Sequence, residues 1–177
     1  MRILAFAASN SSVSINRQLA EYAGRLAEER GALIETLDIH DYEMSLYRHD
    51  RERADGIPQQ AHDFLARIKQ ADALIVSFAE HNGAYTAAFK NLFDWCSRIG
   101  REVWQGRQMI LLATSPGGRG ARGVLEFAVN NTPRFGGEVV GHLSVPSFGE
   151  AFDTGAQKLL DRDLDAQLRE LVAKLTG

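Results

Sequence analysis

Short apolar runs alternate with longer amphipathic stretches along most of this chain. The first run, Ile3–Ala7, has no alternation of apolar and polar residues, which is typical of a strand buried on both faces of a sheet. Four further runs are predicted to be strands of the same sheet. They are Leu33–Leu37, Ala73–Phe78, Met109–Thr114 and Val139–Val145.

Between these strands, apolar residues recur at intervals of three and four positions, which predicts amphipathic helices. The helices are expected from Ile15 to about Gly31, from Pro58 onward, after Phe78, from Ala121 to Asn131, and through Leu160, Leu164, Leu168, Leu171 and Leu175. Pro58 suits the first turn of its helix, and Pro133 ends the fourth. We expect Asp153 or Thr154 to cap the last helix.

The predicted order is βαβαβαβαβα, and each crossover is long enough for parallel pairing. This order predicts an α/β fold, an open and doubly wound sheet with helices on both faces. One domain over residues 1–177 accounts for the whole chain. The charged, weakly periodic segment Asp38–Gly56 is expected to be a long loop with a functional or interfacial role.

Composition narrows the class of partner. Hydrophobic residues make up 45% and charged residues 24%, which is ordinary for a soluble globular protein. A net charge of −3 argues against nucleic acid, and no apolar run approaches the roughly 20 residues of a membrane span. The single cysteine, Cys96, excludes an internal disulfide and favours a cytoplasmic location. Its place on the apolar side of a helix predicts a core residue rather than a nucleophile.

Polar turns follow three of the predicted strands, at Ala8–Asn16, Ala79–Tyr85 and Thr114–Gly120. Ligands of parallel sheets bind at the carboxyl ends of strands, so these turns predict a bound nucleotide. In the first turn, the free N–H groups of a helix start favour an anion. Ser9 and Asn16, together with Ser14, are candidate side-chain donors to a phosphate. The alternative is that one serine only caps the helix.

The second turn carries the candidate ring contacts. Asn82-Gly83 lets the backbone come close to a flat ring, because glycine has no Cβ. His81 is either a ring contact or an ordinary loop histidine. Glu80 could act as a general base, but the spacing implies no partner for it.

Several other kinds of site are excluded. The chain has no G-x-G-x-x-G fingerprint after its first strand and no P-loop. Ala7, Ala8 and Ser9 stand where a phospho-acceptor receiver domain needs acidic residues. Ser115 has no G-x-S-x-G elbow around it, and the histidines have no metal-ligand spacing.

The three turns resemble those of the NADPH-dependent FMN reductase family, which includes quinone, azo-compound and chromate reductases. The first turn is similar to the family's G-S-x-R-x-x-S-x-N phosphate loop, and Ser115–Gly120 looks like its third ring-binding turn. Glu80–Gly83, with Lys90-Asn91 and Asp94-Trp95 after it, resembles the P-E-Y-N-x-S/G turn and the K-N-x-x-D-W helix. The segment Leu46–Asp50 is also similar to the family's second-strand loop.

The chain departs from the family's pattern at three positions. It has Ser11 where the family often has arginine, Ala79 where the family has proline, and His81 where the family has tyrosine. An arginine would add a charge-assisted contact to the phosphate, worth roughly 1.5–3 kcal/mol.

The resemblance implies a flavodoxin-like three-layer sandwich, with five parallel strands in the order 2-1-3-4-5, that binds one FMN. It implies NADPH or NADH as hydride donor and a quinone, azo compound or free flavin as small-molecule acceptor. The two would react by exchange (ping-pong) through flavin N5, with no catalytic protein residue. It also implies a homodimer or homotetramer. The implied cofactor-binding residues are Ser9, Ser11, Ser14, Ile15, Asn16, Glu80, His81, Asn82, Gly83, Ser115, Pro116, Gly117 and Gly118.

Two alternatives stay open beside this enzyme. One is a flavodoxin-type electron carrier, although a net charge of −3 is weak for docking on basic partners. The other is a flavin-free regulatory protein on the same fold, which the loss of the arginine at Ser11 would permit.

Overall fold

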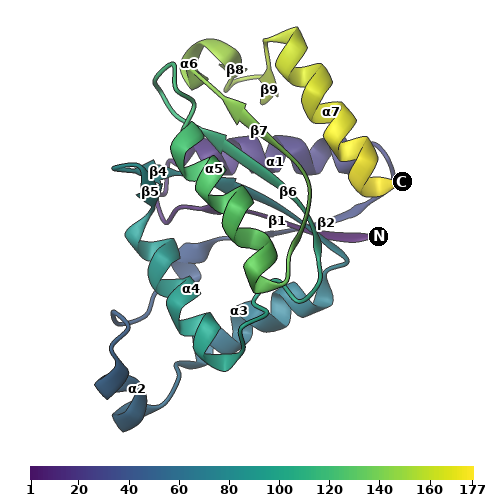
Figure 1. Cartoon of the computed structure of the whole chain (residues 1–177). Coiled ribbons are helices and arrows are strands. Elements are labelled where there is room, and N and C mark those ends of the chain that lie inside the picture. The colour runs from purple at the N-terminus through teal and green to yellow at the C-terminus, as the bar shows by residue number, and fades with distance from the viewer.

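Five parallel strands form the centre of the computed structural model, which describes residues 1–177 (Figure 1). Their order, β2-β1-β3-β6-β7, is the predicted 2-1-3-4-5 order, so the flavodoxin-like fold is confirmed. All four pairings are parallel. The strands are β1 (Arg2–Ala8), β2 (Leu33–Leu37), β3 (Ala73–Phe78), β6 (Gln108–Thr114) and β7 (Glu138–Val145).

Helices cover both faces of the sheet (Figure 1). On one face lie α1 (Ile15–Glu28), α6 (Phe148–Ala151) and α7 (Arg162–Thr176), and on the other lie α3 (Gln59–Gln70), α4 (Ala87–Ile99) and α5 (Arg122–Asn131). Apolar side chains of β1, β3 and β6 alternate between the two cores, which is why these strands are apolar throughout. No helix of the fold combines the length and the hydropathy that a membrane span requires.

The registers bring three strand ends together at one edge of the sheet. Ala8 at the end of β1 pairs with Phe78 of β3, and Phe78 pairs with Ala113 of β6. The polar turns that follow these strands therefore start side by side. Two of them lead into α1 and α5, and the other leads into α4 through a hairpin of β4 (Glu80–His81) and β5 (Ala84–Tyr85).

The weak periodicity of the segment 38–56 predicts a long loop, and this prediction is wrong. It contains a 3-10 helix, η1 (Ile39–Tyr42), and a short helix, α2 (His49–Asp55). The Asp38 carboxylate accepts from the His40 N–H at 3.0 Å and starts η1. No residue of α2 is buried, so this helix has no apolar periodicity to detect.

The predicted start of the last helix is wrong. Its cap is Asp161, whose carboxylate accepts from the N–H groups of Asp163 and Leu164. Asp153 instead accepts from two N–H groups inside the loop between β8 (Phe152–Asp153) and β9 (Lys158–Leu159). Leu160 lies before the helix and is 53% exposed. A second 3-10 helix, η2 (Thr132–Phe135), carries Pro133 after α5.

Candidate functional site

One buried side chain, that of Asn16 in α1, joins the ends of β3 and β6 beneath the polar turns. The Asn16 amide donates from Nδ2 to the Thr114 carbonyl at 3.1 Å, and its Oδ1 accepts from the Thr114 N–H at 3.0 Å. The same oxygen accepts from Ser77 Oγ at 2.8 Å. Asn16 is 2% exposed. This side chain therefore helps to position the turns, in addition to the role as a phosphate donor that the sequence predicts for it.

The serines of the first turn use their oxygens to shape the turn. Ser14 caps α1 by accepting from the Arg17 N–H at 3.2 Å, as the capping alternative proposed. Ser9 accepts from the Ser11 N–H, and Ser11 accepts from the Val13 N–H. A serine hydroxyl that accepts a hydrogen bond still has its own proton to donate. The three hydroxyls thus remain potential donors to a ligand.

Several backbone N–H groups of the first turn have no acceptor in the protein. They belong to Asn10, Ser12, Ser14, Ile15 and Asn16. Those of Ile15 and Asn16 lie in the first turn of α1, a helix of 14 residues, where the helix dipole adds positive potential. Such a set of donors fits an anion such as a phosphate.

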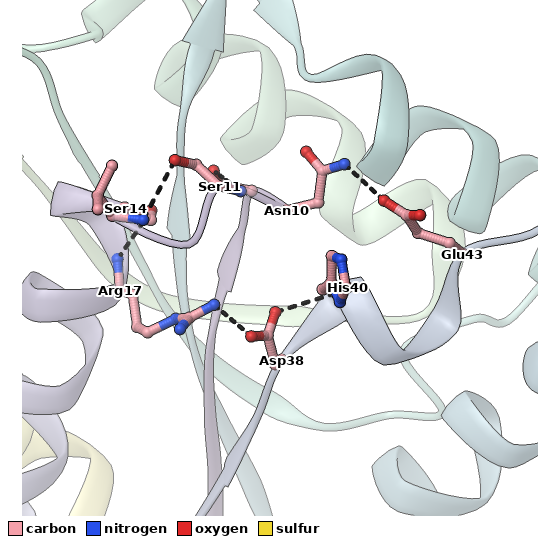
Figure 2. Close-up of polar contacts among 9 residues, drawn as sticks. Asn10, Ser11, Ser14, Arg17, Asp38, His40 and Glu43 are labelled. Carbon is pink, nitrogen blue, oxygen red and sulfur yellow. Dashed lines mark hydrogen bonds and ion pairs between the residues drawn. The ribbon is translucent and has the colours of Figure 1, made fainter.

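The charged side chains beside this turn are already paired (Figure 2). The Arg17 guanidinium forms an ion pair with Asp38, which also starts η1. Asn10 donates from Nδ2 to the Glu43 carboxylate at 2.8 Å. Arg17 therefore does not replace the arginine that is absent at Ser11. An anion bound at this turn would therefore be held by neutral donors and by the start of α1.

The second turn is a tight two-residue hairpin. Asn82 and Gly83 have φ angles of +53° and +78°, the left-handed values that a type I′ turn needs. Neither residue's N–H has an acceptor in the protein. The hairpin is anchored by Tyr85, which stacks on Phe78 at 5.3 Å and meets Phe89 edge-on at 5.1 Å. The exposed tip of the hairpin thus presents free N–H groups, and the aromatic packing of Tyr85 holds the hairpin in place.

Glu80 connects the second turn to the helix that follows the third. Its Oε2 accepts from the Val124 N–H in the first turn of α5 at 2.7 Å. The N-cap residue of α5, Ala121, has a left-handed backbone and no side-chain cap. A Cβ at Gly123 would lie 2.9 Å from the same oxygen, so the glycine makes room for the carboxylate. This partner argues for a positioning role, not for the general base considered from the sequence.

The third turn lies open at the same edge. Ser115 is half-buried, and Pro116, Gly117 and Gly118 are exposed. The Gly117 carbonyl accepts from the N–H groups of Gly120 and Ser147, which ties the turn to the segment after β7. The N–H groups of Ser115, Gly117 and Gly118 have no acceptor in the protein. This turn therefore offers a second row of backbone donors facing the edge.

The cysteine and the histidines differ in their exposure to solvent. Cys96 is buried, as predicted, and burial raises the pKa of its thiol to about 12. His40, His49, His62 and His142 are exposed, and so is His81 at the tip of the hairpin. The protein holds no cluster of metal-ligating side chains.

Sequence reasoning missed Thr86, which supports the first two turns together. It caps α4 by accepting from the Phe89 N–H, and its hydroxyl donates to the Ala8 carbonyl at 3.0 Å. A threonine directly before an amphipathic helix is a recognisable cap signal. The bond to Ala8 has no sequence signal, because it crosses 78 positions.

Comparison with known proteins identifies the family of the chain. Residues 1–150 match the family model described as NADPH-dependent FMN reductase. The chain is 30% identical over 151 residues to a quinone reductase of Pseudomonas putida, covering 84% of this chain and 75% of that protein. It is 28% identical over 134 residues to the quinone reductase of Escherichia coli K12, covering 70% and 71% of the two chains.

Solved structures agree on the fold. FerB from Paracoccus denitrificans, a flavoenzyme NAD(P)H:(acceptor) oxidoreductase, superposes with a TM-score of 0.75 at 23% identity, over 99% of this chain and 94% of that one. A flavodoxin from Pseudomonas aeruginosa superposes with a TM-score of 0.62 at 16% identity over the full length of both chains. The family match covers all three turns, and the chain belongs to the NADPH-dependent FMN reductase family, a family of FMN-dependent oxidoreductases that take electrons from NAD(P)H.

Proposed function

We propose that this protein transfers a hydride from NAD(P)H, through a bound FMN, to a small-molecule acceptor such as a quinone. Azo compounds and free flavins also accept two electrons and are the other candidate acceptors. One observation carries the proposal: three turns with unpaired backbone N–H groups start side by side at the carboxyl edge of the sheet. Ligands of this class of fold bind at that edge.

The first turn would hold the FMN phosphate. The unpaired N–H groups of Ile15 and Asn16, and the hydroxyls of Ser9, Ser11 and Ser14, supply donors there. Because Arg17 is paired with Asp38, no guanidinium contributes to this set. Its donors are weaker than a bidentate arginine, so we expect FMN to dissociate more easily than from relatives that have one.

The second and third turns would flank the isoalloxazine ring. Asn82 and Gly83 present N–H groups on one side, and Ser115, Gly117 and Gly118 present them on the other. Pro116 and His81 are the bulkier residues of these turns, and His81 is free to contact the ring or the solvent. Glu80 would act indirectly, by keeping the two turns at a constant separation through Val124.

The residues of the turns bind and orient, and they supply no acid or base. When bound, FMN supplies the hydride-accepting centre that this reaction needs. The unpaired N–H groups of Ser115 and Gly117 would stabilise negative charge on a ring placed against them, as an oxyanion hole does. The open edge leaves room for donor and acceptor to bind in turn, which is the basis for an exchange mechanism.

We also propose that the protein works as a homodimer or homotetramer in the cytoplasm. A cavity of about 220 Å³ lies beside the first turn and is lined mainly by apolar residues of the segment 39–46 and α4. Leu46, on its rim, is 72% exposed. A second copy would cover such a residue. Sedimentation velocity tests this, and a monomer at micromolar concentration would contradict it.

The visible spectrum of the freshly purified protein, before and after FMN is added, tests the cofactor. A yellow protein bleached anaerobically by NADPH or NADH, and recoloured by a quinone, supports the enzyme. A flavodoxin-type carrier would bind FMN but would not be reduced by either nucleotide. A flavin-free regulatory protein would stay colourless with excess FMN.

A further inference from the structure

Beside the third turn lies a cavity of about 270 Å³ that has no apolar residue on its wall. It is lined by Gly118, Arg119, Arg122, Gly123 and Glu126. Gly118 belongs to the turn proposed to flank the flavin ring, so the cavity adjoins that site. The other residues belong to the end of the turn and to α5.

The two arginines of this cavity are free of partners in the protein. Neither guanidinium forms an ion pair or a side-chain hydrogen bond, whereas Arg17, Arg98 and Arg169 all pair with carboxylates. Both side chains are exposed. Glu126 is the one carboxylate among the lining residues, and the Glu80 carboxylate lies next to Gly123, where it already accepts from the Val124 N–H.

The N-terminus of α5 would not by itself bind an anion in this cavity. The Val124 N–H in its first turn is already occupied by the Glu80 carboxylate. An anion in the cavity would therefore be held by the arginines, whose planar guanidinium groups match the geometry of phosphate oxygens.

Four arginines near the helices that follow the second and third turns could contact a nucleotide phosphate. Arg98 is excluded because it pairs with Glu52 at 3.1 Å. Arg101 follows the far end of α4, at the opposite edge of the sheet from the turns. Only Arg119 and Arg122 combine free guanidinium groups with a place beside the third turn.

We propose that Arg119 and Arg122 form the subsite that binds a phosphate of the hydride donor, adjacent to the flavin site. This inference rests on the proposed function for the identity of its ligand. The phosphate is either the 2′-phosphate that distinguishes NADPH from NADH or the diphosphate that both share. In the first case the pair sets the donor preference, and in the second it sets donor affinity alone.

Isothermal titration of the FMN-loaded protein with adenosine 2′,5′-bisphosphate and with ADP tests the proposal without relying on turnover. For the double variant Arg119→Gln/Arg122→Gln, we expect binding of at least one ligand to weaken by roughly tenfold or more, as loss of charge-assisted bonds predicts. Weakening of the bisphosphate alone assigns the 2′-phosphate, and similar weakening of both assigns the diphosphate. The matched control is Arg101→Gln, which removes an exposed, unpaired arginine at the far edge.

A wild-type protein that binds neither ligand overturns the subsite. So does a double variant that binds both ligands as the wild type does, or a control variant that weakens them equally. Failure of the proposed function would be seen separately, as a protein that NADPH and NADH do not bleach. Both arginines are exposed, so an unchanged melting temperature is expected and verifies that the double variant is folded.

Discussion

Asn16 and Thr114 are 98 positions apart, and they form two hydrogen bonds with each other. The Asn16 amide both donates to and accepts from the Thr114 backbone. It therefore makes the hydrogen bonds that a residue of a neighbouring strand would make at the end of β6. Through Ser77 it also reaches the end of β3. The first turn, which leads into Asn16, is thus tied to the ends of β3 and β6, where the second and third turns begin.

Replacing Asn16 with alanine is expected to destabilise the protein by about 2–4 kcal/mol, because buried donors and acceptors on Thr114 and Ser77 lose their partner. Urea unfolding measures this loss. FMN affinity should fall as well, since the turns lose their common support. Ser12→Ala is the control, because Ser12 is exposed and its hydroxyl makes no hydrogen bond. Equal stability of the two variants would contradict the role of Asn16.

Gly123→Ala should destabilise the protein by about 1 kcal/mol, although alanine normally favours a helix by about that amount over glycine. The reason is the 2.9 Å approach of the new Cβ to Glu80 Oε2. Thermal unfolding gives the comparison with Gly149→Ala, whose Cβ would meet no atom within 4 Å.

The same pair of positions permits a double-mutant cycle. In a Glu80→Ala background the clash is absent, so Gly123→Ala should become neutral or stabilising. If Gly123→Ala costs the same in both backgrounds, Glu80 does not approach α5 as described. A drop in FMN affinity for Glu80→Ala would support its role in spacing the second and third turns.

Asn82 is the residue at which the hairpin is most sensitive to side-chain shape. Its φ of +53° is accessible to asparagine and glycine, but it costs a leucine roughly 1–2 kcal/mol. Asn82→Gly should keep FMN binding, and Asn82→Leu should weaken it by roughly tenfold. Quenching of flavin fluorescence measures both affinities. Equal affinity in the two variants would remove this hairpin from the flavin site.

The buried thiol of Cys96 is expected to make the free energy of unfolding decrease at alkaline pH. Burial raises the pKa of its thiol to about 12, so the thiol stays protonated in the folded state while it ionises in the unfolded chain. Stability from this group is therefore complete below the unfolded pKa of about 8.5 and decreases between there and about pH 12, by about 1.4 kcal/mol per pH unit. Unfolding free energies between pH 8 and pH 11 should show a flatter dependence for Cys96→Ala. The same dependence in both proteins would contradict burial of the thiol.

The sheet and its helices could be predicted because their signal is local. The predicted bounds of Ala73–Phe78 agree with those of β3, because a short, continuous apolar run is typical of a strand that is buried on both faces of a sheet. The cap of the last helix was wrong for a related reason. The prediction named Asp153 or Thr154, and the β8–β9 hairpin, which has no strong sequence signal, separates them from the observed cap, Asp161.

The candidate site also has features that are local in sequence and features that depend on packing. The sequence alone determined the three polar turns, their order after the apolar strands and the family to which they point. Tertiary structure alone decided that the Asn16 amide bonds the Thr114 backbone, that Glu80 caps α5, and that Arg17 is paired while Arg119 and Arg122 are free. The physical reason is that periodicity and turn chemistry act between near neighbours in the chain. Hydrogen bonds across 44 to 98 positions exist only after packing has brought their partners together.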